Sequence, residues 1–214
     1  NGYSASRENY GVFSFNLNAL FNPSSKGGYT WSRILPARPQ LYGQYDGFNY
    51  LGFGMLALLG VLCAAAVVLA VRSKAGRAAL AGLLRRNLVL ILGMAFMTLF
   101  AITNVVCFDD VELLNIPLPE GLVKLCGIFR ASGRMFYPVY YVLMTACIVG
   151  LARLLRRVGK AALYPAVLVL VAAVQLFDLS AMIAEKHTAM SETAAKPQPY
   201  PQELVGCRGY YGTL

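Results

Sequence analysis

Two arginines four residues apart, Arg130 and Arg134, are the side chains of this sequence best suited to hold an anion. They stand directly before a charge-free run that starts at Met135. The forked N–H donors of arginine match phosphate oxygens, so the pair predicts a clamp on a phosphate or pyrophosphate of a lipid-linked substrate. Two structural interpretations stay open: the side chains reach lipid phosphates at the membrane surface, or they pair with acids of the same loop.

The first 47 residues are dense in aromatic and amide side chains and supply a second group of candidates. Amides donate and accept hydrogen bonds while rings offer flat apolar faces, a combination typical of sugar recognition. The candidates in this segment are Asn16, Asn18, Tyr45 and Asp46. The same composition is typical of a well-packed Ω-loop, and Asp46 stands where it would cap a following helix. Binding and packing roles are therefore both open.

The remaining residues exclude several kinds of site. The single histidine, His187, lies in a polar segment, so neither a Ser-His-Asp triad nor an HExxH zinc site is predicted within this sequence. The five cysteines lack C-x-x-C spacing, although Cys107 and Cys126 could form a disulfide if their compartment is oxidising. No catalytic residue, cofactor or metal ligand is assigned, and a divalent metal would have to be held by the full-length protein.

Four apolar runs without a charge predict the helices that must position the candidate binding side chains. They predict spans at about 48–71, 87–108, 135–152 and 161–180, since about 20 helical residues cross a bilayer. Of the 214 residues, 57% are hydrophobic and only 14% charged, against about 25% charged in soluble proteins. The sequence therefore predicts an all-α polytopic membrane protein with four transmembrane helices over 48–184. An extended outer loop, 1–47, precedes them and a Pro-containing tail, 185–214, follows.

The basic residues predict the orientation of these spans. Segments 72–86 and 153–160 together hold nine of the 19 Lys and Arg residues and no acid. By the positive-inside rule both segments lie in the cytoplasm, while 1–47, 109–134 and 178–214 face outward. The net charge of +9 is thereby accounted for by topology, and no nucleic-acid partner is predicted.

The outer segment 109–134 contains one further predicted element. Leu122, Leu125, Cys126 and Phe129 follow one another at helical spacing and form one apolar face. This pattern predicts a short helix lying flat in the outer membrane interface.

Several strings of the sequence resemble a bacterial family of large polytopic membrane proteins catalogued as DUF6311, a domain of unknown function. The resemblance covers most of the 214 residues and is carried by Tyr10–Pro23, Trp31–Pro36, Gly43–Gly52, Arg130–Tyr141 and Phe177–Ser180. Such proteins look like GT-C glycosyltransferases. The resemblance thus implies transfer of a sugar from a polyprenyl-phosphate donor to an envelope glycan or lipid acceptor, on the outer face of the bacterial inner membrane.

The resemblance also implies that the catalytic acid belongs to an earlier outer loop, so that this sequence is the C-terminal part of the membrane domain. Two other functions stay open, a transporter or flippase subunit and a non-catalytic envelope assembly protein. Ionisable residues inside spans mark ion pathways, and the predicted spans carry only Asp178, at an edge. That scarcity weighs against a proton-coupled carrier.

Overall fold

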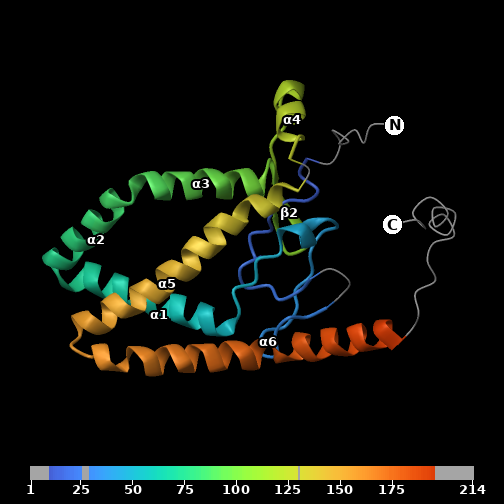
Figure 1. Cartoon of the computed structure of the whole chain (residues 1–214). Helices are drawn as coiled ribbons and strands as arrows, with labels where there is room; N and C mark the ends of the chain where they lie inside the picture. The colour runs from blue at the N-terminus through green and yellow to red at the C-terminus, as the bar shows by residue number, and fades with distance from the viewer. Residues whose placement is uncertain (1–9, 26–28, 130, 196–214) are drawn as a thin grey trace, which may run out of the picture. The chain divides into compact units, whose positions relative to one another are not determined.

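The computed structural model describes residues 10–25, 29–129 and 131–195, and it is mostly helical (Figure 1). Three 3-10 turns accompany the helices, η3 Gln44–Gly47, η4 Ser132–Phe136 and η5 Ala161–Leu163. The α-helices are α1 Phe53–Arg72, α2 Lys74–Arg86, α3 Leu88–Ile102, α4 Glu120–Cys126, α5 Tyr137–Arg157 and α6 Tyr164–Ala195. The two strands are β1 Val105–Phe108 and β2 Val111–Asn115.

Three of the helical segments are long and apolar enough to cross a membrane. They are α1, η4 with α5 (Ser132–Arg157), and the Ala161–Glu192 segment that contains most of α6. The helices α2 and α3 pass the same test only as a pair, and this pair is bent by 70°. The described part of this membrane protein therefore has three helices able to span, and α3, the second helix of the bent pair, occupies the region of the second predicted span.

The second predicted span, 87–108, ends earlier than its apolar run suggests. Helix α3 has 15 residues and stops at Ile102, after which Thr103 adopts a left-handed φ of 68°. Val105 and Val106 then enter an antiparallel hairpin that turns at Asp109 and Asp110. Apolar content alone does not distinguish a helix from a strand, and β-branched residues before a two-residue polar turn favour the hairpin. The all-α prediction is wrong for this two-stranded sheet.

The basic segment 72–86, predicted as a loop, is mostly the amphipathic helix α2. Ser73 caps it, with its side chain accepting a hydrogen bond from the Gly76 backbone N–H at 3.1 Å. Gly76 permits the sharp junction with α1, because a Cβ there would lie 2.3 Å from the Leu69 carbonyl oxygen. A helix at this position was signalled by the Ser cap and by leucines at helical spacing.

Residues 10–25 and 29–52, called the outer layer after the side on which they are predicted to lie, pack tightly against the ends of the helices. Phe15 stacks on Phe136 with ring centroids 4.1 Å apart, and its backbone N–H donates to the Ala101 carbonyl at 2.8 Å. Gly47 and Gly133 allow η3 and η4 to touch, since a Cβ on Gly133 would lie 2.8 Å from the Gly47 Cα. This segment is a folded layer, as the Ω-loop interpretation expected.

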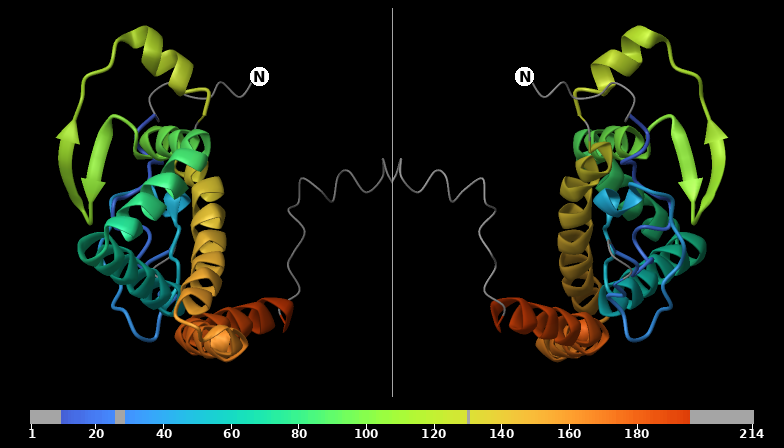
Figure 2. Two further views of the ribbon diagram at one scale, coloured as in Figure 1. Left: turned by 90° about the vertical axis from the view of Figure 1, so that its left-hand side faces the viewer. Right: turned by 90° about the vertical axis from the view of Figure 1, so that its right-hand side faces the viewer.

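Helix α5 packs against both α1 and α3 (Figure 1). One core cluster joins α1 to α5 through Leu51, Met55, Leu58, Cys147 and Leu151. The hairpin and α4 lie beside the bundle of α1, α3 and α5 (Figure 2). Helix α4 agrees with the predicted short helix, although it ends at Cys126 and not at Phe129. Its place in a membrane interface stays a prediction.

The C-terminal region begins differently from the predicted tail. Among the described residues, one compact unit ends at Ala181 and a second begins at Met182. Helix α6 continues to Ala195, so the first part of the predicted 185–214 tail is helical, and the rest lies outside the described residues. Cys107 and Cys126 are both free thiols, so the disulfide considered between them is not formed.

Candidate functional site

The strings that carry the family resemblance, far apart in the sequence, meet where the outer layer packs on α1, α5 and α6. Ser32 and Ile34 contact Asp178, and the Arg33 Nε donates to the Ser180 hydroxyl at 2.6 Å. The Ser132 hydroxyl donates to the Phe13 carbonyl at 3.3 Å. One folded cluster is therefore built from segments that the sequence separates by up to 150 residues, and it is the candidate site.

Asp178 is the buried centre of this cluster, with no exposed surface. Its Oδ2 accepts from the Tyr50 hydroxyl at 2.7 Å and from the Phe53 N–H at 3.0 Å. Its Oδ1 accepts from the Ser32 hydroxyl and from the Ile34 N–H. Two of the four partners are backbone N–H groups, which only donate, and one of them bonds to each carboxyl oxygen, so both oxygens act as acceptors. Asp178, predicted at the edge of a span, lies near the middle of α6.

Asp178 and Gln175 together cap the first turn of α1. The Phe53 N–H donates to Asp178 and the Met55 N–H donates to Gln175 Oε1 at 3.2 Å, which satisfies two N–H groups that a helix start leaves open. The negative carboxylate is also stabilised by the positive end of the helix dipole. The turn before α1 requires glycine, because Gly52 has a φ of 81° and a Cβ there would lie 1.7 Å from the Gln175 amide nitrogen.

A cavity of about 240 Å³ opens beside this cap. Aromatic rings from the outer layer and from α5 form most of its wall, and amides of Asn49 and Gln175 supply polar groups. The lining residues are Trp31, Phe48, Asn49, Tyr50, Tyr137, Tyr140, Tyr141, Gln175 and Leu179. The indole N–H of Trp31 is buried and has no hydrogen-bond partner among the described residues. A buried donor without a partner is costly, so this N–H is suited to a ligand oxygen.

Arg134 lies on η4, at the start of α5, and pairs with Asp46 of the outer layer. The Arg134 Nη2 lies 3.0 Å from the Asp46 Oδ1. This partner is 88 residues away in sequence, so the predicted pairing within the same loop is not the one found, and Asp46 does not cap α1. The Arg134 side chain is 58% exposed, and Asp46 engages one of its nitrogens. Arg130 lies outside the described residues.

Asn16 and Asn18 are buried in an amide network within the outer layer. The Asn16 Nδ2 donates to the Gln44 Oε1 and to the Asp109 carbonyl, both at 2.7 Å. The Asn18 Nδ2 donates to the Asp109 carboxylate at 2.5 Å. These bonds hold the outer layer to the hairpin turn. The Asn18 Oδ1 is buried and has no partner among the described residues.

Arg38 completes this network with a forked contact to Asp109. Its Nε lies 2.8 Å from Oδ1, and its Nη2 contacts Oδ2. The hydrogen bonds from Arg38, and that from Asn18, hold the pKa of Asp109 below its usual value. Tyr45, the remaining candidate, is half-buried, with its ring at the edge of the Phe13 ring, 6.2 Å between centroids.

The structure thus separates the predicted candidates. It places Asp46 and Arg134 together at the surface, and it places Asn16 and Asn18 in a buried network whose amide nitrogens bond within the protein. Across residues 10–25, 29–129 and 131–195 no group of three or more His, Cys, Asp or Glu side chains could hold a metal ion.

The sequence reasoning missed Trp31, Gln175 and the role of Asp178. A signal was present for Asp178, since an acid in an otherwise apolar run needs a buried partner. The strings Trp31–Pro36 and Phe177–Ser180 were both singled out, but nothing in the sequence showed that they touch.

The comparison with known proteins gives one match. The family described as Domain of unknown function (DUF6311) matches residues 1–180. No curated protein and no solved structure is significantly similar to the chain.

Proposed function

Because the chain belongs to the DUF6311 family, we propose that it is part of a GT-C-like membrane glycosyltransferase. Such an enzyme moves a sugar from a polyprenyl-phosphate donor to an envelope glycan or lipid acceptor on the outer face of the bacterial inner membrane. The observation that supports this most is the aromatic cavity, whose buried Trp31 N–H has no partner. In this orientation the basic segments 72–86 and 153–160 face the cytoplasm.

The cavity suits a single sugar ring. Its volume of about 240 Å³ is below the roughly 300–1,000 Å³ of sites for drug-sized ligands. Aromatic rings cover the apolar faces of a sugar, and Trp31 and Asn49 are lining residues whose side chains carry hydrogen-bonding groups for its hydroxyls. We assign the sugar or acceptor hydroxyls to this cavity.

The transfer reaction gives a role to Arg134. An acceptor hydroxyl oxygen attacks the anomeric carbon, the bond from that carbon to the phosphate oxygen breaks, and polyprenyl phosphate leaves. The acceptor proton passes to a base. Arg134, together with Arg130, would stabilise the departing phosphate, since Asp46 uses only one of the nitrogens of the Arg134 guanidinium and fixes its position.

Asp178 does not serve as the base in this scheme. Its carboxylate is fully buried and already accepts four hydrogen bonds, so an acceptor hydroxyl cannot reach it. The same burial argues against Asp178 as a proton carrier in a transporter, where an acid must meet the transport pathway. None of the described residues is assigned as the base.

Radiolabelled lipid-linked sugar offered to the intact membrane protein tests the proposal. Replacing Arg134 with Ala should lower transfer about a hundredfold or more, as removal of a charge-stabilising donor does in other enzymes. Arg134→Lys should recover only part of the rate, because a single ammonium lacks the fork. Unchanged transfer by Arg134→Ala would eliminate the clamp.

A second pair of variants addresses the cavity. Trp31→Phe keeps an aromatic ring but removes the N–H donor, and should raise KM for the sugar substrate. Tyr42→Phe is the control, because Tyr42 is 80% exposed and lies outside the cavity lining. Movement of labelled lipid across vesicles without product would instead support a flippase, and neither activity would support an assembly protein.

A further inference from the structure

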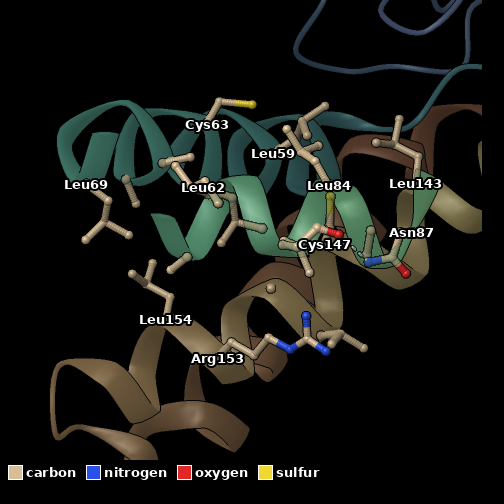
Figure 3. Close-up of a pocket in the computed structure, with 18 of the residues that line it drawn as sticks. Leu59, Leu62, Cys63, Leu69, Leu84, Asn87, Leu143, Cys147, Arg153 and Leu154 are labelled. Atoms are coloured by element: carbon tan, nitrogen blue, oxygen red, sulfur yellow. Dashed lines mark hydrogen bonds between the residues drawn. The ribbon is translucent and has the colours of Figure 1, made fainter. Parts of the chain in front are cut away.

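A second and larger cavity lies at the opposite, basic end of the helices. Its volume is about 830 Å³, and it is an open cavity lined by α1, α2, the start of α3 and residues of α5 from Val142 to Arg157. Leucine side chains dominate its wall, among them Leu59, Leu62 and Leu69 of α1 and Leu84 of α2 (Figure 3). The volume is that of a site for a drug-sized or larger apolar molecule.

Two arginines give this apolar cavity a charged edge. Arg153 and Arg157, one turn apart on α5, line it and are exposed. Arg153 is seen among the lining side chains in Figure 3. The ion pairs found in the described part of the chain involve Arg38, Lys124 and Arg134, so neither of these two arginines has a carboxylate partner there.

Helix α2 adds to the same electrostatic surface. Its inner side lines the cavity with Leu80, Leu83 and Leu84, while Lys74, Arg77, Arg85 and Arg86 belong to the same helix without any acid. A basic amphipathic helix of this kind lies in the headgroup region of a membrane and attracts anionic lipid. The cavity therefore joins an apolar interior to a positive rim at headgroup level.

We propose that this cavity binds an anionic membrane phospholipid, with its acyl chain between α1, α2, α3 and α5 and its phosphate on Arg153 and Arg157. The two guanidinium groups match phosphate oxygens through paired N–H donors. A protein helix packed here would leave both arginines without a partner unless it carried acids at the same height. A phospholipid supplies the apolar chain and the negative group in one molecule. The inference does not depend on the proposed glycosyltransferase activity.

Native mass spectrometry of the intact protein tests this site. Phosphatidylglycerol and phosphatidylcholine with the same acyl chains are titrated into the protein in mild detergent. The Arg153→Ala, Arg157→Ala double variant should weaken phosphatidylglycerol binding about thirtyfold and phosphatidylcholine binding much less, because the choline cation of phosphatidylcholine already offsets the charge of its phosphate. Arg156→Ala is the matched control, since Arg156 is an exposed base of the same helix that does not line the cavity.

A variant that fills the cavity with a larger side chain tests the binding of the acyl chain separately. Ala66 is half-buried in the cavity wall, so Ala66→Trp should reduce binding of both lipids. Equal affinity of the wild-type protein for the two lipids would overturn the proposal, as would an equal loss in Arg156→Ala. A photoreactive phosphatidylglycerol that labels no cavity residue would show that another part of the intact protein fills this space, and would overturn it too.

Discussion

Replacement of Asp178 by Asn tests whether a buried carboxylate anchors the outer layer to α1. An amide keeps the size of the carboxylate but exchanges one acceptor oxygen for an NH2 donor. The Tyr50 or Ser32 hydroxyl can turn to accept from that NH2, but the Phe53 and Ile34 backbone N–H groups cannot. Whichever way the amide faces, one of these N–H groups loses its bond to residue 178, although the Ile34 N–H keeps the Ser32 hydroxyl oxygen as an acceptor at 3.0 Å.

The expected decrease in the free energy of unfolding follows from the loss of that one hydrogen bond. The flip that spares the 3.0 Å bond of Phe53 sacrifices the 3.3 Å bond of Ile34, whose N–H still donates to Ser32. Asp178→Asn should therefore cost about as much as one lost hydrogen bond, roughly 0.5–1.5 kcal/mol. For a chain of this size each kcal/mol lowers the Tm by about 2–4 °C. Asp178→Ala removes all four acceptor contacts and leaves a void, so it should cost at least about 4 kcal/mol.

The assay is the temperature at which half of the intact protein in detergent is lost from its monodisperse size-exclusion peak. Asp110→Asn is the matched control, because Asp110 is exposed in the hairpin turn, and such a change costs within about 0.5 kcal/mol. A wild-type Tm in Asp178→Asn would refute a stabilising role for the two carboxyl oxygens as acceptors. Equal losses in Asp178→Asn and Asp178→Ala would refute the hydrogen-bond account of the cost.

Three further predictions concern the outer layer. Gly52→Ala should destabilise the protein by more than about 1 kcal/mol in the same assay, because Gly52 has a positive φ and its new methyl would overlap Gln175; an unchanged Tm would contradict this. The lowered pKa of Asp109 makes Arg38 pairing stabilising above the unfolded pKa of about 3.9, and this contribution is lost as the pH falls through the lower folded value. The Tm of Asp109→Asn should therefore fall less than the wild-type Tm between pH 5 and pH 2, as measured by thermal unfolding at each pH. Burial raises the pKa of Tyr10 to about 12, so Tyr10→Phe should remove one phenolate that appears only above pH 11 in ultraviolet titration.

Much of the architecture could be predicted from local sequence. The charge-free runs around α1, α5 and α6 gave three helices long enough to span, because hydropathy acts on each segment separately. The face of Leu122 and Leu125 similarly indicated the short helix α4. The local pattern predicted the wrong element where an apolar run fits either a helix or a strand. Helix α3 stops at Ile102 and a hairpin follows, although the apolar run continues to Phe108.

The candidate site depended on contacts between distant segments. The sequence selected Arg134, Asp46, Asn16 and Asn18 by residue type, but only the fold pairs Arg134 with Asp46 and buries the two asparagines against the hairpin turn.

The sequence by itself determined that this chain is a membrane protein, where its apolar helices lie and which of its connections are basic. Tertiary structure alone decided that Asp178 is a fully bonded cap of α1. It also decided that Trp31 lines a cavity and that its buried N–H has no partner among the described residues. The physical reason is that helix formation and membrane insertion are set by neighbouring residues. Burial and hydrogen bonding at this site are set by segments separated by more than 100 residues, such as Ser32 and Asp178.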